Sequence, residues 1–493
     1  MKDYQLFIGG ECVDPVNGEW FETVDPYRGE AWARIPRGTA GDVDRAVMAA
    51  GDAMWRGPWT TMSATARGKV MRKLGDLVAE NAERLAEIEV RDNGKLKAEM
   101  LAQVRYHSEW WWYYAGLVDK LEGKLVPIDK PDMFAFTTQE PVGVVGALTA
   151  WNSPLLFVAW KCAAAIAAGC AVIVKPSEFA SASTLEFARL TREAGLPDGM
   201  FNVVTGFGQE AGSAIVSHPG IDKITFTGSD ATGARINELA ARHLKRVSLE
   251  LGGKSPNIIF EDADIDAAVA GAISGIFAAT GQTCIAGSRL LLQNSIRDEV
   301  VSRLVEIAGS ATLGDPMNLE TNIGPVTTPA QYRKVLDYID IARSEGARCV
   351  FGGKAASGEH AVGGQFVEPT IFVDVTNDMR IAREEVFGPV LSVIGFDTED
   401  EAVQIANDTI YGLAAGVWTQ DFRRILRLPK LLRAGTVWVN TYRAVSYMMP
   451  FGGMKHSGIG RESGIDAVSE YLEKKSVWIS TARDAPANPF VIR

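Results

Sequence analysis

Residues 142–148 read Val-Gly-Val-Val-Gly-Ala-Leu, an apolar run of strand length that opens the most regular part of the chain. Three shorter apolar runs follow, at residues 172–174, 201–204 and 224–226, and a stretch of helical character separates each from the next. Fully apolar strands that alternate with helices are typical of a parallel sheet, and ligands bind at the carboxyl ends of such strands. The sequence therefore predicts an α/β fold with a ligand cleft at one edge of the sheet.

A glycine turn follows the last of these strands. Residues 228–233, Gly-Ser-Asp-Ala-Thr-Gly, open a helix, whose backbone N–H groups and positive end suit a pyrophosphate. A lone GxxxxG equally fits a plain turn. After the second strand comes Lys175-Pro-Ser-Glu178, where Glu178 could accept both ribose hydroxyls of an adenosine and would repel a 2′-phosphate. Lys175 could bond the same ribose, although both residues also fit a solvated loop.

One cysteine needs a chemical explanation. In residues 277–287, Phe-Ala-Ala-Thr-Gly-Gln-Thr-Cys-Ile-Ala-Gly, Cys284 lies among small residues that leave room for a substrate. A thiol attacks carbon as its thiolate, so it needs an anion-stabilising setting, whereas a small buried hydrophobe is the commonest fate of a free cysteine. Upstream, residues 246–254 read as a buried strand that runs into a glycine turn. Glu250 interrupts that strand, and a carboxylate there is costly unless it is paired or used.

Length and composition limit the possible functions. A chain of 493 residues exceeds one ordinary hydrophobic core, so two or more domains are expected. A net charge of −11 without a basic stripe disfavours nucleic acid and anionic membranes as partners. The N-terminal segment lacks an apolar targeting region and no run is long enough to span a membrane, so we expect a cytoplasmic protein. Five cysteines without a ligand motif favour a reducing compartment, and scattered histidines make a metal unexpected.

Other segments are predicted as scaffold. Short antiparallel strands are expected in residues 6–35, helices at 42–55, 63–92 and 105–117, and a projecting hairpin at 121–140. The hairpin has exposed aromatic positions that another subunit would cover. Residues 262–266, Asp-x-Asp-x-Asp, should cap a helix and not bind calcium, because the glycine and terminal glutamate of a calcium loop are missing.

Two of these segments together point to a family. Residues 277–284, Phe-x-x-x-Gly-Gln-x-Cys, and residues 249–253, Leu-Glu-Leu-Gly-Gly, resemble the two active-site signatures of the NAD(P)-dependent aldehyde dehydrogenase superfamily. Further motifs extend the resemblance from about Phe7 to about Trp478. It implies an aldehyde dehydrogenase-like α/β fold that assembles as a homodimer or homotetramer. The implied parts are a Rossmann-type NAD-binding domain in residues 1–120 and 141–252, an α/β catalytic domain in 253–456, and a β oligomerisation arm in 121–140 and 470–493.

The resemblance also implies a reaction. An aldehyde would be oxidised to the carboxylic acid through a thiohemiacetal and then a thioester on Cys284. Asn152, in the motif Trp-Asn-Ser-Pro, would hold the oxyanion together with the Cys284 N–H, and Glu250 would activate water. Lys161 and Glu462 resemble proton-relay residues. The presence of Glu250 indicates the hydrolytic, non-acylating type, because relatives that pass the acyl group to coenzyme A or phosphate generally lack it.

Cofactor and substrate residues follow from the same resemblance. NAD is expected, with NADP as the alternative, and its contacts are expected from Trp151, Lys175, Ser177, Glu178, Gly208, Phe226, Gly228, Ser229, Leu251, Glu385 and Phe387. Substrate contacts are expected from Tyr106, Trp110, Phe157, Trp160, Phe277, Arg443, Val445 and Phe451. This aromatic lining suits an aromatic or unsaturated aldehyde. Pairing of Arg443 with a substrate carboxylate would instead make the protein a semialdehyde dehydrogenase, and a non-catalytic nicotinamide-binding protein is the third alternative.

Overall fold

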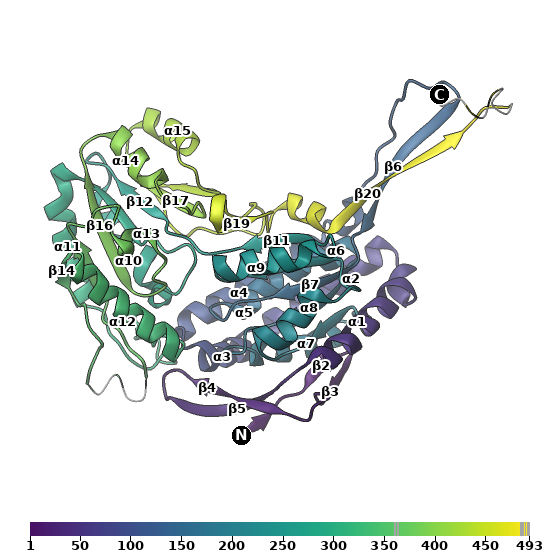
Figure 1. Cartoon of the computed structure of the whole chain (residues 1–493), viewed down its shortest axis with the longest axis horizontal. Coiled ribbons are helices and arrows are strands. Elements are labelled where there is room, and N and C mark those ends of the chain that lie inside the picture. Colours follow the sequence, from purple (N-terminus) through teal and green to yellow (C-terminus); the bar gives the residue numbers. More distant parts are fainter. Residues whose placement is uncertain (359–360, 362–363, 484–487, 489, 491–493) are drawn as a thin grey trace.

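A computed structural model describes residues 1–358, 361, 364–483, 488 and 490 of the chain. Figure 1 shows two bodies, each built around a sheet with helices against it, and a long arm that leaves the body formed by the N-terminal half. Strand β20, near the end of the chain, lies in this arm, far from the N-terminus. No helix among the described residues is long and apolar enough to cross a membrane.

The first sheet has the strand order β19-β11-β10-β7-β8-β9-β2-β3. Its central strands, β11 to β9 in that order, run parallel, which confirms the predicted parallel sheet. Strands β2, β3 and β19 are antiparallel additions at its two ends, so part of the expected N-terminal layer joins the main sheet. The strands are β2 (Leu6–Ile8), β3 (Glu11–Val13), β7 (Val144–Leu148), β8 (Ala171–Lys175), β9 (Phe201–Val203), β10 (Lys223–Thr227), β11 (Arg246–Glu250) and β19 (Gly458–Ile459).

Helices cover this sheet and follow its strands. The prediction of one helix over residues 63–92 is wrong, because two helices meet at Asn81. The backbone of Asn81 is not helical, and its side-chain amide donates to the Leu77 carbonyl at 2.8 Å. The helices are α1 (Ala40–Trp55), α2 (Ala64–Glu80), α3 (Ala82–Asn93), α4 (Lys97–Ala115), α5 (Pro154–Val158), α6 (Ala164–Ala168), α7 (Ala182–Glu193), α8 (Ser213–Ser217) and α9 (Asp230–Ala241). Single π-helical turns, Ala159–Ala163 and Gly208–Gly212, lead into α6 and α8.

The second sheet has the order β14-β15-β16-β13-β12-β17-β18 and is parallel apart from β14. Its strands are β12 (Pro256–Ile259), β13 (Arg289–Gln293), β14 (Arg348–Phe351), β15 (Thr370–Val373), β16 (Val390–Phe396), β17 (Ala414–Trp418) and β18 (Thr436–Val439). Its helices are α10 (Ile265–Phe277), α11 (Arg297–Gly309), α12 (Pro329–Ser344), α13 (Arg380–Arg383), α14 (Glu399–Asn407) and α15 (Phe422–Leu431). As predicted, an aspartate caps α10: the Asp264 carboxylate accepts from the Ala267 N–H at 3.1 Å.

The arm is a two-stranded ribbon of β6 (Met133–Pro141) and β20 (Leu472–Ser480). The sequence predicts a hairpin within residues 121–140, but β6 pairs along its whole length with β20. Residues 121–132 contact β6 through an isolated bridge from Leu125 to Phe136 and through a bond from the Lys124 N–H to the Thr137 hydroxyl at 3.0 Å. Prolines at 127 and 131 explain this, because proline lacks the N–H that a strand ladder needs. A small separate sheet contains β1 (Lys2–Asp3), β4 (Trp20–Asp25) and β5 (Glu30–Pro36).

Candidate active site

A large cleft opens where the parallel strands of the first sheet end. Its volume is about 710 Å³, and it is bordered by the carboxyl ends of β7, β8 and β10 and by the start of α9. The predicted cofactor residues that line it are Trp151, Lys175, Ser177, Glu178, Gly208, Phe226, Gly228 and Ser229. The cleft therefore lies where a parallel sheet is expected to bind its ligand.

The groups in this cleft fit a dinucleotide. Ser229 caps α9 by accepting the Thr232 N–H at 3.3 Å, so the helix begins at the cleft with its positive end toward it. The Lys175 ammonium and the Glu178 carboxylate lie 3.0 Å apart at the end of β8, where hydroxyl groups of a ribose could reach both. Thr149 and Thr227 contribute buried hydroxyls that have no hydrogen-bond partner among the described residues. Unsatisfied polar atoms of this kind are expected where a ligand completes the bonding.

A second cavity continues the cleft inward. It measures about 150 Å³, and Trp151, Thr227, Gly228 and Ser229 line both cavities, so the two adjoin. The residues that line only the inner cavity include Asn152, Phe157, Leu251, Gly252, Cys284, Gln331, Lys334, Glu385 and Phe387. The structure thus brings the predicted cysteine, amide and inner cofactor residues together at the deep end of the cleft.

Cys284 lies on a loop whose conformation is imposed by its surroundings. Ala279 and Thr280 have φ of 55° and 54°, in the left-handed region that non-glycine residues rarely adopt. At Gly281, where φ is 68°, a Cβ atom would lie 2.0 Å from the Gly388 carbonyl oxygen, so only glycine fits. The loop therefore packs against the segment before β16, and this contact fixes the position of Cys284 in the cavity.

The cysteine thiol is half-buried and protonated at neutral pH in this state. Burial is the main cause that raises the pKa of the Cys284 thiol to about 12, and the carboxylates of Glu385 and Glu250 add to it. The Asn152 amide approaches the same loop and donates to the Gln282 carbonyl at 3.1 Å. A nucleophile and an amide donor therefore share one cavity, and the thiol must lose its proton before it can attack.

Glu250 ends β11 directly before Leu251 and Gly252, which line this cavity, but its own side chain is not part of the lining. Its carboxyl is only 5% exposed, and its Oε2 atom has no hydrogen-bond partner among the described residues. Burial, followed by the nearby Glu462 carboxylate, raises the pKa of Glu250 well above its usual value. A Cβ atom at Gly452 would lie 2.8 Å from Glu250 Oε1, so that glycine leaves the room the carboxyl occupies. A carboxyl with a raised pKa is suited to general base work near neutral pH.

Glu462 lies near Glu250 and pairs with a buried lysine. The Lys161 ammonium forms an ion pair with Glu462, and both side chains are inaccessible to solvent. Thr225, on β10, donates its hydroxyl to the same Glu462 oxygen at 3.2 Å. The structure therefore places the two predicted relay residues beneath the predicted base.

The predicted substrate residues form a chain of aromatic rings beside the cysteine. Phe157 lines the inner cavity, and its ring centre lies 6.1 Å from that of Trp160. Trp160 in turn lies 4.8 Å from Phe451 and 6.0 Å from Trp110, and Trp110 lies 5.1 Å from Tyr106. These rings run from the cavity toward the surface, where Tyr106 is exposed.

Of the remaining predicted substrate residues, Val445 contacts this chain of rings directly. Phe277 is buried at the end of α10, just before the cysteine loop. The Val445 carbonyl accepts from the Tyr106 hydroxyl at 3.3 Å. Arg443 is tied to α10, because its Nη1 donates to the Ser274 carbonyl at 3.0 Å. This bond favours the surface interpretation of Arg443 over the carboxylate-binding one.

Gln331 and Lys334 are among the residues of the inner cavity that sequence reasoning missed. Both come from α12, an amphipathic helix whose sequence resembles any scaffold helix. The Gln331 amide donates to the carbonyls of Val386 and Phe387 at 2.8 and 2.9 Å, and so positions the segment that carries Glu385. Glu385 accepts from the Gly253 N–H at 3.1 Å, so it joins its own segment to the signature of residues 249–253. No local pattern marks Gln331, because its role depends on a contact distant in sequence.

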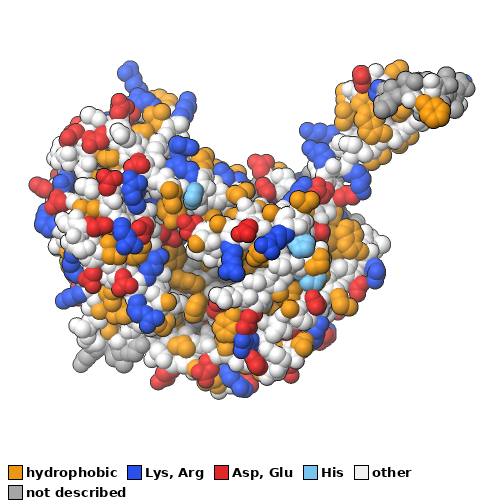
Figure 2. Space-filling model, in the orientation of Figure 1, with side chains coloured by type: hydrophobic (Ala, Val, Ile, Leu, Met, Phe, Trp, Pro, Cys, Tyr) orange, Lys and Arg blue, Asp and Glu red, His pale blue; other side chains and the backbone are white. Residues whose placement is uncertain are grey.

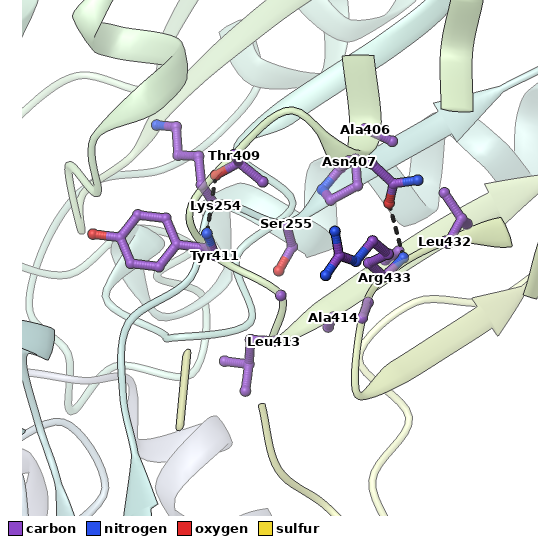
Figure 3. Close-up of a pocket in the computed structure, with 14 residues that line it drawn as sticks. Lys254, Ser255, Ala406, Asn407, Thr409, Tyr411, Leu413, Ala414, Leu432 and Arg433 are labelled. Atoms are coloured by element: carbon purple, nitrogen blue, oxygen red, sulfur yellow. Dashed lines mark hydrogen bonds between the residues drawn. The ribbon is translucent and has the colours of Figure 1, made fainter. Parts of the chain in front are cut away.

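A much smaller hollow lies behind the glycine turn that follows Glu250. It measures about 10 Å³, the lower limit for one water molecule, and is lined in part by Lys254, Tyr411 and Arg433. Figure 3 shows the ends of the Lys254 and Tyr411 side chains pointing away from it. Tyr411 instead donates to Asp230 on α9 at 3.2 Å, which joins the two bodies beside the cofactor cleft. The hollow is a packing gap and not a second ligand site.

The geometry agrees with comparisons to known proteins. The sequence model of the aldehyde dehydrogenase family matches residues 13–477. The chain is 45% identical to (Z)-2-((N-methylformamido)methylene)-5-hydroxybutyrolactone dehydrogenase of Acinetobacter baylyi, with all of both chains covered. It is also 44% identical to the aldehyde dehydrogenase of Bacillus cereus in its NAD+ complex, with a TM-score of 0.95 and coverage of 98% and 97%. It is 39% identical to the betaine aldehyde dehydrogenase of Staphylococcus aureus in complex with NAD+, with a TM-score of 0.97 and coverage of 99% of this chain and 97% of that one. The chain belongs to the aldehyde dehydrogenase family.

Proposed function

We propose that this protein oxidises an aldehyde to the carboxylic acid with NAD, by way of a thioester on Cys284. The observation that supports this most directly is the shared inner cavity: Cys284 and Asn152 line it, it adjoins the dinucleotide cleft, and the Glu250 carboxylate is close enough to Cys284 to raise the pKa of its thiol. NAD-bound relatives with the same fold support the choice of cofactor.

Residues of the cleft would hold the cofactor in three places. Lys175 and Glu178 would bond the adenosine ribose, the start of α9 at Ser229 would receive the pyrophosphate, and Glu385 would bond the nicotinamide ribose. NAD, when bound, accepts the hydride that the aldehyde carbon loses. The Trp151 and Phe387 rings, 5.4 Å apart, line the narrow passage and would exclude water from it.

The protein's own residues carry the covalent steps. After the Cys284 thiol loses its proton, its sulfur bonds to the aldehyde carbon, and the carbonyl oxygen becomes an oxyanion that Asn152 and the Cys284 N–H stabilise. Loss of hydride from that carbon restores the C=O bond and leaves a thioester. Glu250 then takes a proton from water as the water oxygen attacks the thioester. The C–S bond breaks, the carboxylic acid leaves, and the Cys284 sulfur departs as thiolate.

The aromatic lining indicates the substrate class. We propose an aromatic or unsaturated aldehyde of moderate size, because Phe157 lines the cavity of the cysteine and is the first of a chain of neighbouring rings that ends at Tyr106. The name of the Acinetobacter relative, a methylene-substituted hydroxybutyrolactone dehydrogenase, fits an unsaturated substrate. The semialdehyde alternative depends on Arg443, whose guanidinium already bonds the Ser274 carbonyl.

An aldehyde panel tests the activity and the substrate class together. We expect NADH formation, followed by absorbance, with kcat/KM higher for benzaldehyde-type and cinnamaldehyde-type compounds than for ω-carboxy aldehydes. Adding coenzyme A should leave the rate unchanged. Arg443→Ala should cause the same small decrease in kcat/KM for the aromatic aldehydes and for the ω-carboxy aldehydes. A decrease confined to the ω-carboxy aldehydes would show that the semialdehyde assignment is right. No NADH with any member of the panel would contradict the proposed activity.

We also propose that the arm joins subunits and that the chain divides into the two domains predicted above. Residues 484–487, 489 and 491–493 of the predicted arm lie outside the described residues. Figures 1 and 2 show the arm clear of both bodies, with apolar side chains gathered on it. Phe134 on β6 and Trp478 on β20 are 46% and 55% exposed, which is unfavourable unless a second subunit covers them. Light scattering should give a dimer or tetramer for the wild type and a smaller species for Phe134→Ser with Trp478→Ser.

The free state of all the cysteines fits the proposed cytoplasmic location.

A further inference from the structure

A buried lysine lies in the turn that joins helices α3 and α4. The turn has the sequence Asn-Gly-Lys at residues 93–95, and the Lys95 side chain is almost completely buried. Burial is the main cause that lowers the pKa of Lys95, because an ammonium is stabilised less by the protein interior than by water. An apolar side chain would avoid this cost, so the contacts of the ammonium need an explanation.

The Lys95 ammonium bonds the segment that carries the proposed oxyanion donor. It donates to the Ser153 hydroxyl at 3.0 Å, and that hydroxyl donates to the Asn152 carbonyl at 2.7 Å. Asn152 and Ser153 are both buried, so these bonds are shielded from bulk water. The two bonds therefore fix the backbone of Asn152, which lies between β7 and α5 and outside regular secondary structure.

The Asn152 side chain is oriented by a separate contact. One N–H of its amide donates to the Gln282 carbonyl on the cysteine loop at 3.1 Å. A side-chain amide has two N–H groups, so a second donor remains for a developing oxyanion. Contacts at both ends thus hold this residue, one at its carbonyl and one at its amide.

The segment that follows Lys95 also contacts the cysteine loop. Glu99, in the first turn of α4, accepts from the Ala279 N–H at 2.8 Å. Its charge is the largest of those that oppose the effect of burial on the Lys95 ammonium. The other charged or titratable groups that act on this ammonium are Arg443, Glu89 and Cys284. Residues 95–99 therefore contact both the segment of the oxyanion donor and the loop of the nucleophile.

The proposed reaction needs an amide that is already in place. An oxyanion forms as the Cys284 sulfur bonds to the aldehyde carbon, and a donor lowers the barrier most when it is oriented beforehand. A displacement of about 1 Å can cost roughly 10²-fold in rate. Because Asn152 lies outside regular secondary structure, its position depends on the contacts of its neighbours.

We propose that Lys95 is a positioning residue for the oxyanion step, an inference that rests on the proposed function. Through Ser153 the ammonium holds the backbone of Asn152, and the second N–H of the amide then meets the oxyanion. Lys95 keeps its bond to Ser153 throughout the turnover, transfers no proton and touches no reacting atom. A lysine suits this place because its long side chain reaches from the turn after α3 to the start of α5, and Glu99 partly offsets the cost of burial.

The first turnover of the full-length enzyme tests this role. Stopped-flow absorbance with NAD and benzaldehyde gives the rate of the NADH burst, and fluorescence titration gives the Kd for NAD. Lys95→Met removes the ammonium at similar side-chain length, whereas Ser153→Ala breaks the link and keeps the buried charge. Lys97→Met is the matched control, because the Lys97 ammonium bonds Glu87 on α3 at 2.8 Å, outside the site. Both test substitutions are also made in Asn152→Ala.

We expect Lys95→Met and Ser153→Ala each to slow the burst by about tenfold while the Kd for NAD stays unchanged. Lys97→Met should match the wild type. Asn152→Ala alone should slow the burst by roughly 10²–10³, and adding either test substitution should cost about twofold at most, because the lysine acts through the amide. Alkylation of Cys284 by iodoacetamide forms no oxyanion, so Ser153→Ala should keep the wild-type alkylation rate.

A wild-type burst in either Lys95→Met or Ser153→Ala would overturn the proposal. So would a further loss of about tenfold in the Asn152→Ala background, because the lysine would then act independently of the amide. A higher Kd for NAD in either variant, or slower alkylation in Ser153→Ala, would show a displaced site and would also overturn it. Absence of a burst in the wild type would overturn the proposed function itself.

Discussion

Replacing Glu250 by glutamine removes a proton acceptor while keeping the size of the side chain. In the structure the carboxyl is buried, its Oε2 has no partner among the described residues, and Gly452 leaves the space around Oε1. The glutamine amide therefore fits the same space, and acylation of Cys284 and loss of hydride should proceed. Hydrolysis of the thioester should slow, because the attacking water keeps its proton.

General base catalysis contributes roughly 10²–10⁴ in rate. At about 1.4 kcal/mol for each factor of ten, the deacylation barrier should rise by about 3–5 kcal/mol. The pKa of Glu250 is raised by burial and by Glu462, and a base acts only when it is deprotonated. Wild-type deacylation should therefore fall as the pH drops below that raised pKa, and Glu250→Gln should lose this dependence.

Stopped-flow absorbance and intact mass spectrometry measure the two phases separately. The Glu250→Gln enzyme should release close to one NADH per active site in a burst and then accumulate acyl-enzyme. Glu238→Gln, an exposed position on α9, is the control and should behave as the wild type. Undiminished steady-state turnover by Glu250→Gln, or a slow variant without acyl-enzyme, would refute the assignment of Glu250 as the base.

Three further predictions concern the oxyanion, the cofactor and stability. Asn152→Ala should lower kcat by roughly 10²–10³ in steady-state assays, and a change below twofold would exclude its oxyanion role. Gly252→Ala would place a Cβ atom 2.5 Å from Glu385 Oε2, so the Kd for NAD measured by fluorescence titration should rise severalfold; an unchanged Kd would contradict the ribose contact. Burial raises the pKa of Glu89 from 4.5 to about 7, so the folded state holds an extra proton and stability falls as pH rises through that window. Glu89→Gln keeps an acceptor for the Leu155 N–H, and its free energy of unfolding should fall by up to about 3 kcal/mol less than that of the wild type between pH 5 and 7.5. Urea unfolding at the two pH values measures this difference, and equal pH dependence in both proteins would refute the raised pKa of Glu89.

The parallel sheet was predictable because its signal is local. Each strand from β7 to β10 is a short apolar run between turn residues, and burial on both faces leaves few other interpretations. The break at Asn81 was not predictable in the same way, because apolar residues keep helical spacing on both sides of it. No local pattern shows that β6 pairs with β20, which follows it by more than three hundred residues, and only the family resemblance placed the two segments in one arm.

The site residues also differ in whether the local sequence marks them. Cys284 and Glu250 stand out locally, because a thiol among glycines and an acid inside a strand are both unusual. Gln331 acts only through its bonds to the segment of Phe387, and Thr225 only through its bond to Glu462, so neither has a local signal. Their roles come from tertiary contacts, which a single sequence does not display.

In the proposed reaction one carbon atom loses a hydride to NAD while it is bonded to Cys284. The most direct measurement is a single turnover of Glu250→Gln with NAD and benzaldehyde that carries deuterium on the aldehyde carbon, followed by mass spectrometry of the nucleotide and of the digested protein. We predict deuterium in the reduced nucleotide and one benzoyl group on the peptide that contains Cys284. Deuterium released to water, or a benzoyl group on any other residue, would contradict the account.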